Sequence, residues 1–314
     1  MLDVSIVIVC MNRPDNLYPC LRSVISNTGV SYEILVVAYM FSDENYAKAC
    51  ADFPSVTFIR SDEIRGFSEN NNLALRRAKG RFCFVLNDDT EFSTPVIDAL
   101  VKDFDSLPDN AAIVSPRILN ADGTLQLCGR PPYPAIYYAL QQWHLHREPI
   151  DDTASKSPVT GNVYGTSNIT GACFLIRTSV FESLGWFDER YFFTPEDIAL
   201  STLARERGYA VYVDAAQSIT HKWKTTVSGI SPCIRPAAVK GSLIFFGRRS
   251  RAERFLLSFA VWCAESTKRL KAWMRYKLHP SGENRIKWLS FRNISKEIFS
   301  NLTPKEIFIK YYNG

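Results

Sequence analysis

The chain has 314 residues, of which 46% are hydrophobic, and a formal net charge of +5. This length suits one large α/β domain, or one such domain with an appendage, and the absence of any short repeat or low-complexity run excludes repeat and fibrous proteins. The first residues, MLDVSIVIVC, are too short and too weakly charged for a secretory signal, and the apolar run 255–264 is about half as long as a membrane span.

Strand and helix patterns alternate along the first ninety residues. Runs of β-branched and apolar residues predict strands, and apolar residues at helical spacing predict the helices between them. The expected strands are 3–10, 32–39, 56–60 and 81–87, and the expected helices are 12–27, 43–51 and 68–79. This order predicts a mostly parallel, doubly wound α/β sheet, in which ligands bind at the carboxyl ends of the strands.

Two adjacent acids, Asp88 and Asp89, follow the fourth expected strand. Unpaired carboxylates at the end of a buried strand are costly to desolvate. The segment after the first strand, CMNRPDN, has no glycine and therefore no dinucleotide fingerprint or P-loop. Adjacent carboxylates instead suit Mg²⁺ or Mn²⁺, whose remaining positions are taken by phosphate oxygens. The alternative is a turn with solvated acids, since N-D-D-T also favours a turn.

Five stretches of the chain, taken together, match the motifs of a known protein family in order and spacing. They are GFSENNNLAL (66–75), RFCFVLNDDTEF (81–92), NADGTLQLCG (120–129), ITGACFLIRTSVFESLGWFDERYFFTPED (169–197) and ITHKW (219–223). In this order and spacing they resemble the family 2 glycosyltransferases, and most closely the rhamnosyltransferase-like branch that builds bacterial polysaccharides. The resemblance implies the GT-A fold, which is Rossmann-like. It also implies transfer of one sugar from a nucleotide diphosphate donor to a hydroxyl, with inversion at the anomeric carbon and with Mn²⁺ or Mg²⁺ as cofactor.

The resemblance also implies roles for two acidic motifs. Asn87-Asp88-Asp89 falls at the family's D-x-D position, which makes Asp89 the main metal ligand and brings Asp88 near the donor ribose and diphosphate. Glu196-Asp197 falls at the family's Glu-Asp pair, of which Asp197 is the general base and Glu196 lies near the donor. One base opposite the leaving diphosphate suffices for inversion. The alternative is helix N-capping by T-P-E-D, and both roles are compatible.

Further positions follow from the same resemblance. His221 lies where some members complete the metal site, and a neutral imidazole suits a third ligand; the alternative is a satisfied surface histidine. Asn71 and Asn72 match an Asn-Asn pair near the donor, with polar capping as the alternative. The family's base-binding Asp is replaced by Ala38, which cannot accept a hydrogen bond. We expect Tyr39 to stack on the base instead, or the backbone around residues 9–11 to recognise it.

The segment between Gly129 and Thr170 is a long insertion rich in proline and aromatic residues. Long loops inside compact domains are usually functional or mobile. Its aromatic side chains either stack on acceptor sugars or pack a short helix: Tyr133, Tyr137, Tyr138, Trp143 and Tyr164. His144 and His146 lack partners at zinc-site spacing, so we interpret them as loop or acceptor-site residues.

The C-terminal part is strongly basic. Residues 235–314 contain 17 Lys and Arg against 5 Asp and Glu, a net charge of +12, which leaves −7 for residues 1–234. Residues 251–278 predict a helix with aromatic and basic side chains interleaved. We expect it either to bind an anionic membrane surface or to pack against the core or a second subunit of a homodimer. Eight scattered cysteines without a C-x-x-C pair predict free, buried thiols in a reducing compartment.

We therefore predict an inverting, metal-dependent glycosyltransferase with a GT-A domain (1–230) and a basic helical region (231–314). The resemblance alone favours rhamnose or another deoxyhexose as the donor sugar and a glycan or polyprenyl-linked glycan as acceptor. We expect no nucleic-acid partner, and a location in the cytoplasm or at the cytoplasmic face of the membrane. The alternatives are a nucleotidyltransferase, which would need a glycine-rich loop after the first strand, and a non-catalytic glycan- or nucleotide-binding descendant. Ala38 and Ala199 leave room for the latter, whereas Asp89 and Asp197 argue against it.

Overall fold

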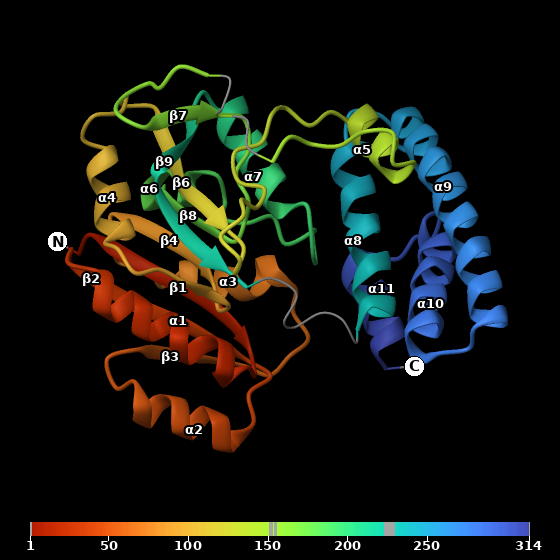
Figure 1. Cartoon of the computed structure of the whole chain (residues 1–314), viewed down its shortest axis with the longest axis horizontal. Coiled ribbons are helices and arrows are strands. Elements are labelled where there is room, and N and C mark those ends of the chain that lie inside the picture. Colours follow the sequence, from red (N-terminus) through yellow and green to blue (C-terminus); the bar gives the residue numbers. More distant parts are fainter. Residues whose placement is uncertain (1, 151–152, 154–155, 223–229, 314) are drawn as a thin grey trace.

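The computed structural model describes residues 2–150, 153, 156–222 and 230–313. Within these ranges the chain folds into a sheet domain and a helical tail (Figure 1). The strands are β1 (Val4–Met11), β2 (Tyr32–Tyr39), β3 (Thr57–Ser61), β4 (Phe82–Asn87), β5 (Thr90–Glu91), β6 (Ala111–Leu119), β7 (Val163–Thr166), β8 (Cys173–Arg177) and β9 (Ala210–His221). The helices are α1 (Pro14–Asn27), α2 (Asp43–Asp52), α3 (Phe67–Leu75), α4 (Val96–Asp103), α5 (Ala135–Gln142), α6 (Thr178–Ser183), α7 (Glu196–Glu206), α8 (Ser231–Phe246), α9 (Arg251–Leu278), α10 (Gly282–Glu297) and α11 (Pro304–Tyr312).

The sheet has the strand order β3-β2-β1-β4-β8-β6-β9-β5, with β7 paired to β9. The first four strands in this order are parallel, which confirms the predicted doubly wound half. β8 then enters antiparallel between β4 and β6. Because the chain moves outward from β1 in both directions, the gap between the ends of β1 and β4 is a switch point, where such sheets bind ligands.

Two apolar layers cover the two faces of the sheet. Along β1, Ile6 and Ile8 face a layer that includes residues of α1 and α4, whereas Val7 faces a layer that includes residues of α3, α6 and α7. A strand buried on both faces explains the continuous apolar run in the sequence. Phe84 on β4 is fully buried, and its replacement by Ala would cost about 3–5 kcal/mol of stability.

α3 is shorter than the sequence predicts, ending at Leu75 rather than at 79. The chain leaves the helix because the backbone N–H groups of Lys79 and Gly80 donate to Ser5 Oγ, at 3.0 and 2.9 Å. A Cβ at Gly80 would lie 2.5 Å from the Ser5 backbone nitrogen, so only glycine permits this approach. Tertiary contact therefore overrides helix propensity here.

The helical tail packs against the sheet domain. Its α9 has the predicted bounds 251–278, and the Ser250 hydroxyl caps it by accepting from the Glu253 N–H at 3.0 Å. Tail residues such as Phe246 share a buried apolar cluster with Tyr133 and Tyr138 from the insertion. None of the helices in the described ranges is long and apolar enough to cross a bilayer. The expected domain boundary after residue 230 comes just after residues 223–229, which lie outside the described residues and include Trp223 of the fifth motif.

Candidate active site

Asp89 and His221 meet at the carboxyl edge of the sheet. β5 pairs antiparallel with the end of β9, so that Thr90 lies opposite His221. Because Asp89 precedes Thr90, its Oδ1 lies 3.1 Å from His221 Nε2. Both side chains are buried, so the surface-histidine alternative does not apply. The structure thus joins two of the predicted site residues through one short strand pair.

Gln126 fixes the imidazole from its other side. Gln126 Nε2 donates to the His221 carbonyl oxygen at 2.6 Å, and Gln126 Oε1 lies 2.9 Å from His221 Nδ1. Since Oε1 can only accept, Nδ1 carries the proton. In the neutral ring, the Nε2 lone pair then faces Asp89 Oδ1, with Asn87 Nδ2 3.3 Å away. An imidazole nitrogen and a carboxylate oxygen at this distance are two ligand atoms that one metal ion could bind.

This pair of ligand atoms fits a divalent metal ion. Neighbouring ligands in an octahedral site lie about 3 Å apart when each is about 2.1 Å from the metal, which agrees with the separation of Asp89 Oδ1 and His221 Nε2. Among the described residues no group of three or more His, Cys, Asp or Glu side chains is arranged to hold a metal. A metal held here would therefore take its other ligands from water or phosphate.

Asp88 lies at the switch point between β1 and β4. Burial raises the pKa of Asp88 to about 6 against the lowering effect of a hydrogen bond from Cys10, and the charge of Asp89 adds to the rise. Cys10 belongs to the end of β1, so the contact ties the two strand ends together. All eight cysteines are free thiols; six are buried, as predicted, whereas Cys50 and Cys263 are half-buried.

Asp197 lies at the first turn of α7, where its carboxylate is held on both oxygens. Oδ1 accepts from the Ile198 N–H at 2.7 Å, and Oδ2 accepts from the Gly171 N–H at 3.2 Å. Arg130 Nη1 is 3.5 Å from Oδ2. These contacts agree with both alternatives for this acid, because the capping interaction also sets the direction of the carboxylate.

A short backbone path connects Asp197 with the carboxyl end of β4. The Asn87 N–H donates to the Ala172 carbonyl oxygen at 2.9 Å, and the adjacent Gly171 N–H is the donor to Asp197. A Cβ at Gly171 would lie 3.4 Å from the Asp197 Cβ, which shows how closely α7 approaches this strand end. The two acidic motifs, far apart in sequence, therefore lie at one site.

Glu196 is buried beside Asp197, with 9% of its surface exposed. Its Oε2 has no hydrogen-bond partner among the described residues. Burial, and after it the charge of Asp197, raises the pKa of Glu196 above its ordinary value. Glu196 thus holds a proton more readily than an exposed glutamate does, and its Oε2 is a buried polar atom whose missing partner calls for an explanation.

Arg130 connects Asp197 to the insertion. Its guanidinium binds both carboxylate oxygens of Glu148, at 3.1 and 2.9 Å, and also lies over the Tyr133 ring. Sequence reasoning does not single out Gln126, Arg130 or Glu148. Gln126 lies within the third motif and Arg130 directly after it. This position was the one feature of the sequence that could have indicated a role for them.

Asn71 and Asn72 are buried in α3 and bind protein groups. Asn71 Nδ2 donates to the Phe67 carbonyl oxygen, four residues back in its own helix, at 2.9 Å. Asn72 donates to the Phe187 carbonyl oxygen and accepts from the Phe187 N–H, at 2.9 and 3.1 Å. Asn72 also donates to Glu189 at 2.8 Å. Asn72 therefore anchors the loop that leads to Glu196, and a contact of the pair with the donor stays a prediction.

The expected base-recognition residues lie at the end of β2. Ala38 is fully buried, and Tyr39 is 7% exposed with its hydroxyl accepting from the Arg65 N–H at 3.3 Å. Two non-glycine residues at neighbouring strand ends, Asn12 and Met40, have left-handed backbones with φ of 48° and 53°. Such strain is typical of functional sheet edges. Little of the Tyr39 ring is free, and stacking on a base stays a prediction.

The aromatic residues of the insertion divide into two groups. Tyr133 and Tyr138 are buried, and Tyr138 stacks on Phe246 of α8 with ring centroids 4.7 Å apart. For these two the packing alternative is therefore confirmed. Tyr137 and Trp143 remain exposed.

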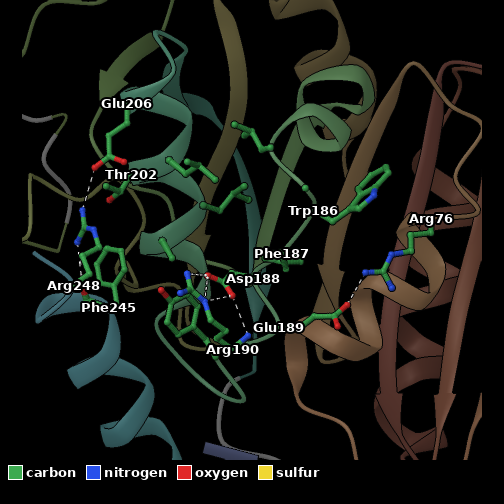
Figure 2. Close-up of a pocket in the computed structure, with 16 residues that line it drawn as sticks. Arg76, Trp186, Phe187, Asp188, Glu189, Arg190, Thr202, Glu206, Phe245 and Arg248 are labelled. Carbon is green, nitrogen blue, oxygen red and sulfur yellow. Dashed lines mark hydrogen bonds and ion pairs between the residues drawn. The ribbon is translucent and has the colours of Figure 1, made fainter. Parts of the chain in front are cut away.

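A separate cavity of about 610 Å³ lies between α7, the end of α8 and the loop 184–191 (Figure 2). Its cations are neutralised locally: Arg248 pairs with Glu206 at 3.1 Å, and Arg190 with Asp188 at 2.6 Å. None of the residues of the two acidic motifs lines it. The cations of this cavity are therefore already paired and do not favour a nucleotide diphosphate there. The cavity lies apart from the candidate site.

Comparison with known proteins gives one family and several relatives. A family model described as Glycosyl transferase family 2 matches residues 5–185, more than half of the chain. The O-antigen biosynthesis protein RfbC of Myxococcus xanthus is 29% identical over 223 residues, which is 69% of this chain and 17% of RfbC. The N-acetylglucosaminyl-diphospho-decaprenol L-rhamnosyltransferase of Mycobacterium tuberculosis is 29% identical over 170 residues, which is 52% of this chain. The chain spans 54% of that relative's length.

Among solved structures, GalNAc-T7 with UDP, GalNAc and Mn²⁺ superposes with a TM-score of 0.57. The superposition covers 75% of this chain and 47% of GalNAc-T7, at 18% sequence identity. Identity this low supports the fold alone. The predicted fold class is thereby confirmed.

Proposed function

Because the chain belongs to glycosyl transferase family 2, we propose that it transfers a sugar from a nucleotide diphosphate donor to a hydroxyl, with inversion and with the help of a divalent metal ion. The observation that carries this proposal is the buried contact between Asp89 and His221, held in place by Gln126 at the carboxyl edge of the sheet. The proximity of Asp197, reached through Ala172 and Gly171, adds a carboxylate that can act on an acceptor.

In this proposal Asp89 and His221 hold the metal, which is Mn²⁺ or Mg²⁺. The metal, when bound, neutralises the charge that develops on the leaving diphosphate. Gln126 keeps the Nδ1 proton in place and so keeps Nε2 directed at the site. Asp88, at the switch point, faces the region where the ribose and the diphosphate would lie.

Asp197 takes the proton from the acceptor hydroxyl as that oxygen attacks the anomeric carbon. An inverting transfer needs one base on the face opposite the leaving group. The Ile198 and Gly171 N–H groups hold the carboxylate, and Arg130 limits its rotation. Glu196, with a raised pKa and an orphaned oxygen, lies at the same site and can bind a sugar hydroxyl.

The finer parts of the proposal concern substrates. A rhamnosyltransferase among the relatives supports rhamnose or another deoxyhexose as the sugar, and the acceptor in its name supports a glycan carried on a polyprenyl diphosphate. Because Ala38 replaces the Asp that binds the base in the family, the resemblance does not favour one nucleotide over another. We also propose a cytoplasmic location, because the proposed donor is a nucleotide-sugar.

A screen of nucleotide-sugars tests the proposal. Thermal stabilisation and slow donor hydrolysis are measured with UDP-, dTDP- and GDP-sugars, with and without Mn²⁺. We expect at least one donor to stabilise the protein only with metal, and to lose that effect in the Asp89→Ala variant. Metal-dependent binding without any hydrolysis or transfer would favour the non-catalytic alternative. Stabilisation that ignores both metal and Asp89 would contradict the assigned metal site.

A further inference from the structure

One side of α9 carries exposed apolar side chains near both ends of the helix. At its start Phe255, Leu256 and Phe259 are 51–67% exposed, and at its end Leu270, Trp273, Met274 and Leu278 are 42–75% exposed. At 100° per residue, these positions fall within a sector of about 140° on one side of a helix about 42 Å long. We call these seven residues the outer face.

The opposite side of α9 is already satisfied. Leu257, Val261, Ala264 and Ala272 are buried against the other tail helices, so that the helix is apolar on two sides. Figure 1 shows α9 at the edge of the tail, with α8 between it and the sheet domain. Two groups of exposed apolar side chains on one side of a helix that already has its packing partners are typical of an interaction site.

Cations border the outer face. α9 contains seven Lys and Arg and two acids. Of these acids, Glu265 is buried and pairs with Lys268 at 2.6 Å. Lys271, Arg275 and Lys287 have no acidic partner within ion-pair distance in the described ranges, and they line a cavity of about 390 Å³ together with Arg235, Lys268 and His144. No acid lines this cavity.

We propose that the outer face of α9 docks on an anionic phospholipid surface, with the flanking cavity receiving lipid phosphate groups. A second copy of the chain would bring two strongly basic helices together. Nucleic acid would use the cations but would leave the aromatic and aliphatic side chains exposed to water. An anionic bilayer interface satisfies both features, since apolar side chains enter the acyl boundary while Lys and Arg contact head groups.

The docking surface is independent of the proposed sugar transfer. Each Lys or Arg near an anionic leaflet contributes about 1 kcal/mol, or roughly a fivefold gain in binding. The two tryptophans of α9 differ in position. Trp262 is partly buried in the tail cluster, whereas Trp273 belongs to the outer face.

Vesicle co-sedimentation without any nucleotide-sugar tests this proposal. The full chain is mixed with vesicles of phosphatidylcholine, or of phosphatidylcholine and phosphatidylglycerol in a ratio of about 3 to 1. We expect binding to the mixed vesicles only, weakened by high salt. Lys271→Glu with Arg275→Glu should reduce it by about 25-fold or more, from roughly fivefold per cation. Phe259→Ser with Leu270→Ser and Trp273→Ser should abolish it.

Two control variants test whether the loss of vesicle binding is specific to the outer face and its cations. Lys102→Glu with Arg207→Glu makes the same charge change at exposed positions of the sheet domain, and Ile25→Ser with Val159→Ser removes exposed apolar side chains there. Both should bind like the wild type. Equal losses in the controls, or no binding to mixed vesicles at low salt, would overturn the proposal. So would a dimer in solution that only the outer-face variant dissociates, because the face would then join two copies of the chain.

Discussion

The Gln126→Leu substitution tests whether the second ligand of the metal is positioned as the geometry indicates. Gln126 makes two hydrogen bonds to His221, one to the ring at 2.9 Å and one to the carbonyl oxygen at 2.6 Å, and it is 9% exposed. Leucine has a similar volume and can make neither bond. The substitution leaves a buried N–H and a buried carbonyl oxygen unpaired, which costs about 1–3 kcal/mol of stability.

The larger expected effect is on metal binding. Without the acceptor at Nδ1 the imidazole can exchange tautomers and turn, so that Nε2 no longer faces Asp89. Loss of such an outer partner typically weakens metal affinity by about 10–100-fold. Calorimetric titration of Mn²⁺ in the presence of UDP or dTDP measures this change. Gln217→Leu, the same substitution on the strand that carries His221, should leave the affinity unaltered. Unchanged Mn²⁺ affinity in a folded Gln126→Leu protein would refute the assignment of His221.

Three further substitutions extend the test. Asp89→Ala should abolish metal-dependent nucleotide binding while the protein stays folded, as judged by calorimetry and circular dichroism. Asp197→Asn should lower the transfer rate by about 100-fold or more with little change in donor affinity, since it removes the proton acceptor; near-normal turnover would exclude the base. Burial, then the charge and hydrogen bond of Asp214, raises the pKa of Asp103 to about 7 from 3.8. The folded state therefore binds this proton more tightly, and stability contributed by Asp103 is lost as the pH rises from about 4 to about 7. Asp103→Asn should remove that loss, gaining about 1 kcal/mol above pH 7 after allowance for partial exposure and nothing below pH 4. Urea unfolding of both proteins at several pH values measures this gain. A stability difference that is the same at every pH would contradict its attribution to the ionisation of Asp103.

Features with a strong local signal were predictable. The β1 to β4 strands follow from short apolar runs, and the bounds of α9 follow from a capping serine at 250 and a sustained apolar pattern. The position of Asp88 and Asp89 at a ligand edge follows from the alternation of strands and helices. Each of these inferences depends on residues that are close together in the sequence.

Contacts between distant segments were not predictable in the same way. Gln126 reaches His221, and Arg130 reaches Asp197, across long stretches of chain, and no local periodicity records such a pairing. The Asn pair of α3 shows the opposite case. Its motif was recognised from the sequence, but the bonds from Asn72 to the Phe187 backbone were not, because a buried amide satisfies whichever polar groups the fold brings to it.

The helical tail contacts the segment that carries Asp197, and this contact decides how the roles of the tail and of Asp197 can be separated by experiment. A Cβ at Gly241 of α8 would lie 2.7 Å from the Thr194 carbonyl oxygen, so the α8 backbone contacts the segment just before α7. Tyr191 and Ile198, on either side of Asp197, are buried in the same apolar cluster as the tail residues. Truncation after residue 234 would expose that cluster and displace the first turn of α7, where the carboxylate of Asp197 is held. A truncated protein would then lose sugar transfer and vesicle binding together, whatever the tail does. Substitutions on the outer face of α9 avoid this, because those side chains are exposed and α8 remains in place.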